Sequence, residues 1–241
     1  MTIRFSLDRW AAWAPGLPDA EAWQAWLAAP RPLPDEGLPA LAEMPAMMRR
    51  RLERLGRIAL QAAYWGQDDA APCPIVFASR HGDSVRTVAL LRQLAAEDGL
   101  SPTAFSLSVH NAIGALFSIA RQDPTSYTAV ALGEETAEAA FTEALGLLAG
   151  GEPCVLVVCY DEPLPEPFDG FNRSDEFPRA WACRLSRAQA GGLSLETLPA
   201  QAEARATDLP PDLTVLRFLL STETTLEHTV GARTWRWQRH A

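Results

Sequence analysis

The chain has 241 residues, enough for one large domain or two small ones, and 48% of them are hydrophobic, which excludes a disordered chain. Thirty acidic and 21 basic residues give a net charge of −9, so a nucleic-acid-binding surface is not expected. All 21 basic residues are arginine, and the absence of lysine excludes a Schiff-base lysine and a GK[ST] phosphate loop.

The cysteines and the chain start bear on the cellular compartment. Cys73, Cys154, Cys159 and Cys183 are too few and too scattered for a disulfide framework, so we expect buried free thiols. The first residues lack the pattern of a secretory signal, and no window of about 18 residues is apolar without a charge. We therefore expect a cytoplasmic protein with no membrane span, no metal and no other cofactor.

Residues 1–45 are rich in Pro and Trp. The Trp10/Trp13 and Trp23/Trp26 pairs have a spacing of three, which predicts that each pair shares one face of a helical turn. The prolines divide this region into short pieces that cannot merge into a long helix. We expect the tryptophans to anchor a core or an interface.

The segment from Met47 to Ala63 has the pattern of one amphipathic helix. Its arginines lie mostly off the apolar stripe; they are Arg49, Arg50, Arg51, Arg54 and Arg57. Two interpretations remain open for them: a face that is solvated or paired within the chain, or a docking site for an acidic carrier protein.

From residue 74 strands and helices alternate. The pattern predicts strands at 74–79, 127–132 and 153–160, and helices at 84–96, 109–120 and 134–149. The strand at 153–160 is apolar on both faces, as a central strand covered by helices would be. Strand, helix and strand at this spacing predict a parallel, right-handed crossover.

Beyond Asp161 the pattern changes to a connection rich in Pro and acidic residues. Strands are predicted at 180–185, 193–198 and 234–238, and an apolar segment at 213–220. Residues 124–178 hold 11 acidic residues and one arginine. This excess of negative charge indicates either a solvated face or a surface that docks a basic partner.

Two histidines are candidate polar groups for chemistry. His81 lies two residues before Asp83, but this pair cannot form a relay without a nucleophile, and Asp83 fits the start of a helix. His110 precedes Asn111 at the start of the apolar helix, where we expect polar side chains to satisfy free backbone N–H groups.

The turn that holds Glu134 and Glu135 follows a predicted strand and opens a helix. Enzymes place a thiol at such turns because the positive end of the helix lowers its pKa. Here carboxylates stand in place of a thiol, and the helix end stabilises them for the same electrostatic reason.

Residues 101–162 resemble the amino-terminal half of β-ketoacyl synthases. Ser101-Pro102, Asn111 with Gly114, and the strand from Tyr127 to Val130 occupy the matching places. Counting back from residues 140–145, the nucleophilic Cys of that family falls on Glu135, or on Glu134 if the alignment slips by one residue. The Trp-rich opening and residues 47–60 resemble the short chain length factor proteins that accompany aryl polyene and related type II polyketide systems.

The resemblance implies an α/β fold of the thiolase-like type, truncated mainly to its amino-terminal half, with a mixed sheet covered by helices. It implies one ketosynthase-like domain over 1–241. Within it, 1–45 would be an N-terminal segment, 46–162 the thiolase-like core, and 163–241 an extension with short strands. About 80 residues beyond 163 are too few to replace a second half, so we expect apolar surface that is covered only in a complex.

Two departures from the synthase pattern bear on activity. The turn has no Cys, and none of His81, His110, His228 and His240 stands in a catalytic histidine motif of the family. Decarboxylative condensation needs a thiolate and groups that stabilise an enolate, so we expect no catalysis. The resemblance then implies a chain length factor in fatty acid or polyketide biosynthesis, forming a heterodimer with a full-length β-ketoacyl synthase and shaping its acyl tunnel. The candidate tunnel or interface residues are His110, Asn111, Gly114, Tyr127, Val130 and Glu135.

Two alternatives stay open from the residues. One is an acyl-thioester hydrolase or acyltransferase that uses His110 or His81 with a carboxylate such as Glu135. The other is a homodimer that binds acyl carrier protein through the arginines of the 49–57 segment.

Overall fold

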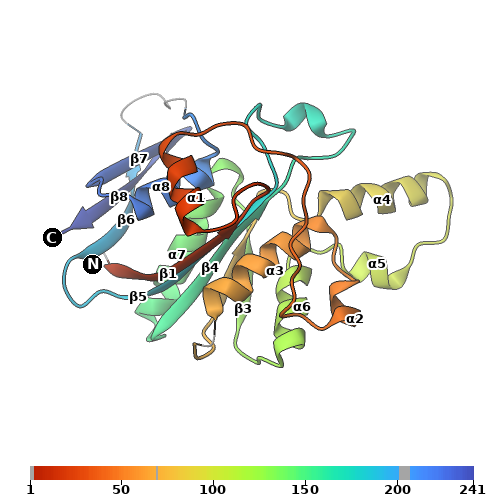
Figure 1. Ribbon diagram of the computed structural model, residues 1–241, viewed down its shortest axis with the longest axis horizontal. Coiled ribbons are helices and arrows are strands. Elements are labelled where there is room, and N and C mark those ends of the chain that lie inside the picture. The colour runs from red at the N-terminus through yellow and green to blue at the C-terminus, as the bar shows by residue number, and fades with distance from the viewer. Residues whose placement is uncertain (1–2, 69, 201–206) are drawn as a thin grey trace.

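The computed structural model describes residues 3–68, 70–200 and 207–241 (Figure 1). Its strands are β1 (Phe5–Trp13), β2 (Ile75–Ala78), β3 (Tyr127–Val130), β4 (Cys154–Asp161), β5 (Arg179–Arg187), β6 (Gly192–Pro199), β7 (Thr225–Val230) and β8 (Arg233–His240). Its α-helices are α1 (Ala20–Ala28), α2 (Ala46–Arg49), α3 (Arg54–Gln67), α4 (Ser84–Ala95), α5 (Pro102–Ser106), α6 (Ala112–Arg121), α7 (Thr136–Ala149) and α8 (Pro211–Leu220). Two single 3-10 turns are η1 (Gly133–Glu135) and η2 (Asp169–Phe171).

All the strands belong to one mixed sheet, in the order β3-β2-β4-β5-β1-β6-β8-β7. β2 lies between β3 and β4 and pairs with both in parallel, which confirms the predicted parallel arrangement of the 127–132 and 153–160 strands. From β4 onward every pairing is antiparallel. The sheet therefore has a short parallel end at β3 and a longer antiparallel end at β7.

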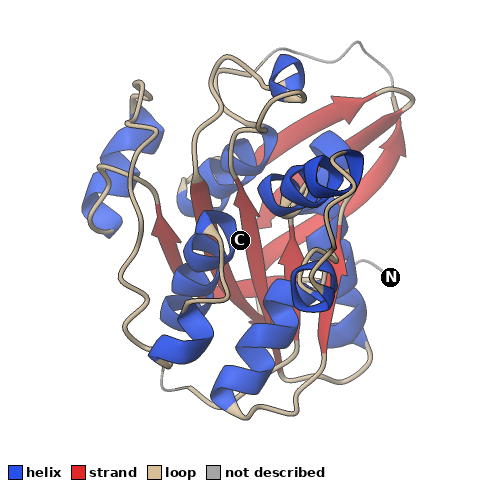
Figure 2. Cartoon of the chain, turned by 90° about the vertical axis from the view of Figure 1, so that its right-hand side faces the viewer, coloured by secondary structure: helices blue, strands red, loops and turns tan. Residues whose placement is uncertain are grey.

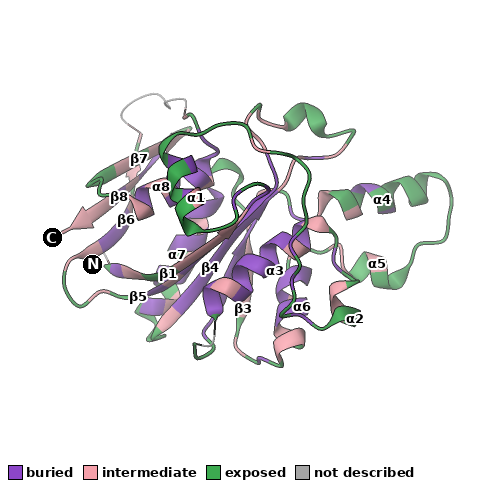
Figure 3. Cartoon of the chain, viewed as in Figure 1, coloured by how far each residue is buried: buried purple, intermediate pink, exposed green. Residues whose placement is uncertain are grey.

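Helices cover both faces of the sheet (Figure 2). One core contains residues of α1, α7 and α8, and the other contains residues of α3 and α6. β4 contributes to both cores, since Val155 and Val157 belong to the first and Leu156 and Val158 to the second. Its burial from Val155 to Asp161 confirms the prediction of a central strand (Figure 3).

The N-terminal region differs in part from the prediction. Trp10 and Trp13 do not share a helical face, because they lie in β1, which pairs with β5 along its length. Side chains three apart on a strand point to opposite faces, and Trp10 packs against one core while Trp13 packs against the other. Trp23 and Trp26 do share a face of α1, with ring centroids 5.9 Å apart.

The predicted helix from Met47 to Ala63 is two helices, α2 and α3, because the chain turns at residues 50–53. The turn brings Leu52 into the core, where its side chain packs directly on Gly56. A Cβ atom at position 56 would lie only 2.7 Å from Leu52 Cδ2. The helix expected at 109–120 begins only at Ala112, and the short α5 precedes it. The apolar segment at 213–220 is the helix α8.

The segment from 163 to the end covers more of the sheet than its length suggested. It supplies β5, β6, β8 and β7, and α8 packs with α7 and α1 over one face. This part of the chain therefore folds back onto the sheet, and the expectation of apolar surface that is covered only in a complex stays a prediction. Among the helices that the structure describes, none is long and apolar enough to cross a membrane.

Candidate functional site

The turn between β3 and α7 has the strand–turn–helix form expected for the nucleophile position of a condensing enzyme. Gly133 has a φ of +56°, a left-handed conformation that glycine adopts without strain. The Thr136 hydroxyl closes the turn, since it accepts from Leu132 N at 2.9 Å and donates to Gly133 O at 2.7 Å. This hydroxyl is thus engaged by the backbone of the turn on both its donor and its acceptor side.

The two glutamates of this turn point to different surroundings. Glu135 is only 9% exposed, and its Oε1 accepts a hydrogen bond from Trp235 Nε1 at 2.7 Å, with Arg233 Nε at 3.5 Å. Glu134 lies at the surface, 3.8 Å from the Arg173 guanidinium. Glu135 is therefore a buried acceptor for strand β8.

One turn further along α7, a second carboxylate meets the same hairpin. Glu138 is fully buried, and its Oε1 lies 2.8 Å from Nδ1 of His228 in β7. Burial pulls the pKa of His228 down, but the hydrogen bond and charge of Glu138 outweigh it and raise the pKa overall. Together the Glu135 and Glu138 contacts fix the β7–β8 hairpin against the start of α7.

The prediction that His110 and Asn111 cap the start of α6 is wrong. Asn111 occupies the N-cap position, but its side chain makes no capping hydrogen bond. The Nε2 atom of His110 lies 3.2 Å from the carbonyl of Val130, and its ring packs against Gly82, where a Cβ would be 2.7 Å from Nδ1. His110 thus joins the end of β3 to the turn after β2.

Gly114 and Tyr127 touch each other between α6 and β3. A Cβ at Gly114 would lie 2.6 Å from Tyr127 Cδ2 and 3.0 Å from Phe77 Cδ2. Glycine at this position lets the helix approach the strands closely. The predicted interface residues His110, Asn111, Gly114, Tyr127 and Val130 therefore gather around α6 and β3.

His81 and Asp83 separate in their roles. Asp83 caps α4, as predicted, by accepting from Arg86 N at 3.0 Å. Burial and the neighbouring Arg80 lower the pKa of His81, whose Nε2 lies 3.5 Å from the Arg80 guanidinium. Within the described part of the chain, neither His81 nor His110 hydrogen-bonds a carboxylate, so the structure does not assemble the pair that a hydrolase would need.

The arginines of the 49–57 segment fall into two groups. Arg49 donates to the carbonyls of Ala40 and Leu41, and Arg54 donates to Glu162 Oε2 at 2.6 Å. The side chains of Arg50, Arg51 and Arg57 make no hydrogen bond or ion pair to any residue that the structure describes. Sequence reasoning treated the five as one group, and the structure assigns two of them to the chain's own contacts.

A buried network of charges at the carboxyl ends of β2 and β4 was not predicted. Asp161 accepts from Ser79 Oγ at 2.9 Å and from Arg80 N at 3.0 Å, and burial raises its pKa to about 7. Next to it, fully buried Arg179 lies between Glu176 and Asp212, at 2.5 and 2.7 Å. These contacts join β2, β4, β5 and α8, so the network serves the fold.

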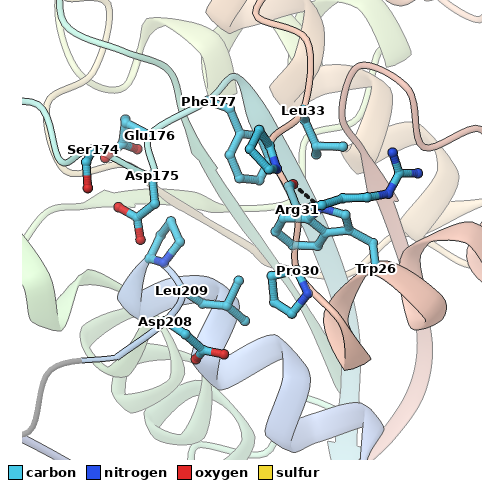
Figure 4. A pocket seen from close by; sticks show the side chains of 12 residues that line it. Trp26, Pro30, Arg31, Leu33, Ser174, Asp175, Glu176, Phe177, Asp208 and Leu209 are labelled. Carbon is cyan, nitrogen blue, oxygen red and sulfur yellow. Dashed lines mark hydrogen bonds between the residues drawn. The ribbon is translucent and has the colours of Figure 1, made fainter.

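A hollow of about 310 Å³ lies between the segment after α1, the 174–177 loop and the start of α8 (Figure 4). Trp26, Phe177, Leu209 and several prolines line it. The Trp26 indole donates to Arg31 O at 2.8 Å, which holds the segment after α1 in place. No histidine or cysteine lines the hollow, and no group of three or more metal-ligating side chains occurs among the residues placed in the structure.

Sequence reasoning missed the partners of the glutamates. Trp235 is 100 residues from Glu135, and His228 is 90 residues from Glu138. The only local signal was the alternation of arginine and tryptophan at 233–237, which predicts the strand but not what it contacts.

Comparison with solved structures places this site in a known fold. One chain of "Ketosynthase (ApeO) in Complex with its Chain Length Factor (ApeC) from Xenorhabdus doucetiae" matches at a TM-score of 0.85 and 28% identity, over 98% of this chain and 100% of that one. The ishigamide ketosynthase/chain length factor matches at a TM-score of 0.64 and 15% identity, over 81% of this chain and 67% of that one. A β-ketoacyl synthase from Burkholderia phymatum matches at 0.59 and 14%, over 84% of this chain and 66% of that one. These matches confirm the thiolase-like fold.

No curated protein sequence matches the chain. The family model described as "Beta-ketoacyl synthase, N-terminal domain" matches residues 23–238, which is most of the chain. The turn between β3 and α7, the helix α7 and the strands β2 to β7 lie within that match, whereas β1 lies before it. The chain therefore belongs to the family of the β-ketoacyl synthase N-terminal domain.

Proposed function

We propose that the chain is a non-catalytic subunit, a chain length factor, that pairs with a full-length β-ketoacyl synthase in aryl polyene-like or related type II polyketide or fatty acid biosynthesis. The observation that carries the proposal is the buried carboxylate of Glu135, hydrogen-bonded by Trp235. In this proposal Glu135, or Glu134 if the alignment slips by one residue, stands at the position of the family's nucleophile. A condensing enzyme needs a thiolate there to hold the acyl chain. In this role the subunit would limit chain length by shaping the acyl tunnel of its partner.

The likeness to a chain of a ketosynthase–chain length factor complex supports this role, because it covers nearly the whole of both chains. Proteins of this kind act as pairs, and the expected location for such a pair is the cytoplasm. The partner in our proposal is the catalytic subunit, which supplies the thiolate and the histidines that this chain lacks.

The expected pairing surface is the α4–α6 flank, which we define as residues 84–132: α4, α5, α6, the edge strand β3 and the connections between and just after them. β3 ends the sheet, so its outer backbone groups have no strand partner within the described residues. The flank carries most of the large apolar side chains that the structure exposes: Val85, Leu91, Leu94, Leu100, Phe105, Val109, Ile119 and Leu132. Exposed apolar side chains in such numbers mark interaction surfaces.

Acyl loading tests the proposed lack of catalysis. The purified chain is incubated with a thioester-linked acyl carrier protein, and its intact mass is then measured. We expect no covalent adduct, whereas an active ketosynthase treated in parallel gains the acyl group on its cysteine. A stable adduct on any residue of this chain would contradict the proposal.

Pairing is tested by co-expression with the cognate ketosynthase, followed by size-exclusion chromatography with light scattering. We expect a stable complex of one copy of each chain. The Phe105→Asp, Ile119→Asp variant should weaken pairing at least about tenfold, because charged groups would enter a dry interface. Leu38→Asp is the matched control, since Leu38 is 51% exposed but lies off the flank. A monomer that stays soluble and does not bind the ketosynthase would contradict the proposed pairing.

Carrier protein docking is tested at Arg50 and Arg51, because Arg49 and Arg54 are already held by their own chain. If these arginines form a solvated face, the Arg50→Glu, Arg51→Glu variant should leave carrier binding unchanged, and we expect this result. A tenfold or greater loss that shrinks as the salt concentration rises would instead assign the segment to the carrier.

A further inference from the structure

Two of the four cysteines lie side by side at the amino ends of neighbouring strands. Ile75 of β2 pairs with Leu156 of β4, and Cys73 and Cys154 each stand two residues earlier. Both cysteines belong to the core on the α3 face of the sheet. Neighbouring strands lie about 4.8 Å apart, which is within the range of roughly 4.4–6.8 Å between Cα atoms that a disulfide spans.

A single arginine contacts both sulfur atoms. Arg184 of β5 pairs with Leu156, and its guanidinium lies 2.9 Å from Cys154 Sγ and 3.6 Å from Cys73 Sγ. A guanidinium next to a sulfur stabilises the thiolate, which is the form that reacts with oxidants. The arginine is held in turn by the carbonyl of Ala71 at 3.1 Å.

The two thiols differ in access. Cys154 is half-buried, whereas Cys73 is only 2% exposed. Burial, with a smaller contribution from Cys154, raises the pKa of Cys73 to about 12, against the opposing effect of Arg184. Cys154 is therefore the thiol that a small oxidant reaches first, and Cys73 is the neighbour that can resolve the product.

The other two cysteines provide an internal contrast. Cys159 and Cys183 also lie on neighbouring strands, but both are almost fully buried, and burial raises the pKa of each. No arginine hydrogen-bonds either sulfur in the part of the chain that the structure describes. Neither of them has the solvent exposure of Cys154 or a guanidinium such as that of Arg184 beside its sulfur.

We propose that Cys73 and Cys154 form a redox-responsive pair that hydrogen peroxide converts into a disulfide. The Cys154 thiolate attacks one peroxide oxygen, the O–O bond breaks, and sulfenic acid and hydroxide form. This hydroxide becomes water by taking the proton that the Cys154 thiol released when it ionised. The Cys73 sulfur then attacks the Cys154 sulfur, the S–O bond breaks, and the departing hydroxide takes the Cys73 proton to give water. The two thiols are oxidised by two electrons, and one peroxide is reduced to two waters. Reducing thiols reverse the reaction by exchange.

The full-length chain, reduced and freed of excess reductant, is treated with hydrogen peroxide and examined by intact mass. We expect a loss of about 2 Da, two hydrogen atoms, that reductant restores. Since the chain has no lysine, trypsin cleaves only after arginine, and the disulfide should join the peptides 58–80 and 122–173. The second peptide also holds Cys159, so the same experiment is run on Cys159→Ala, which should form the disulfide unchanged.

Three further variants test the separate roles. Cys73→Ala should lose the disulfide and leave a sulfenic acid on Cys154 that dimedone traps, whereas Cys154→Ala should stop both reactions. Arg184→Gln should slow the reaction several-fold, because the guanidinium no longer stabilises the thiolate. A protein that stays reduced, that joins Cys159 to Cys183 instead, or that converts Cys154 only to the sulfinic acid would overturn the proposal.

Discussion

The turn before α7 and the α4–α6 flank lie beside the same edge strand, but the chain treats them in opposite ways. At the turn, Glu135 and Glu138 are buried and hydrogen-bonded by residues of the β7–β8 hairpin. On the flank, side chains such as Phe105 and Ile119 stand more than 60% exposed. The turn is therefore part of this chain's own packing, whereas the flank beside it leaves large apolar side chains exposed to solvent.

The largest expected effect is at Arg179, which joins the strand β5 to the helix α8 through Asp212. Arg179→Met leaves the Asp212 carboxylate without its cation and Glu176 with Arg80 alone, so we expect a loss of about 3–5 kcal/mol in the free energy of unfolding in urea. Arg217→Met is the control, because its pair with Asp208 is exposed and should contribute only about 0–1 kcal/mol. Equal losses in the two variants would show that the buried network does not hold α8.

A second test addresses the packing behind the flank. Gly114→Ala places a methyl group 2.6 Å from Tyr127 Cδ2, and we expect a loss of about 1–3 kcal/mol in unfolding free energy, with weaker pairing as β3 shifts. Gly146→Ala in α7 meets no atom within 4 Å and should instead stabilise the chain by roughly 0.5–1 kcal/mol. If both substitutions stabilise, α6 does not depend on close contact with β3.

A double-mutant cycle measures how firmly the hairpin holds the turn. Trp235→Phe removes the donor to Glu135, and Glu135→Leu removes the acceptor, so the coupling between the two changes should be about 0.5–3 kcal/mol. Trp237→Phe supplies the control, because the buried Trp237 indole has no hydrogen-bond partner among the described residues and should show no coupling to Glu135→Leu. Zero coupling at Trp235 would mean that the hydrogen bond contributes nothing to the closure of the turn.

The smallest expected effect depends on pH. The folded-state pKa of His228 is raised above its usual 6.5 by Glu138, so the extra stability is fully present below about pH 6.5 and is lost as the pH rises through the folded value. His228→Gln cannot titrate, and subtracting its urea stability from that of the parent cancels the other groups. This difference in unfolding free energy should fall as the pH rises. A difference that does not change with pH would show that the charge of His228 does not contribute to its contact with Glu138.

Short-range chemistry made part of the fold predictable from sequence. The apolar run of β4, the Asp83 cap of α4 and the turn that opens α7 each depend on neighbours within a few residues. β1 was missed because its tryptophan spacing also fits a helical turn, and only its pairing with β5 decides between the two. The partners of Glu135 and Glu138 depend on how the last 30 residues fold back, and no local pattern encodes that.

The place of β1 in the sheet has a consequence for synthesis on the ribosome. The strand lies between β5 and β6, and Phe5 pairs with Arg187. Within the sheet as the structure describes it, the β3-β2-β4 group and the β6-β8-β7 group are therefore joined through β1 and β5, whose contacts are among the most distant in the sequence. Such contacts form late because the loop that they close is long. We expect the nascent chain to hold its first strand unpaired until residue 187 has emerged, so the sheet closes around β1 only after most of these residues have been made.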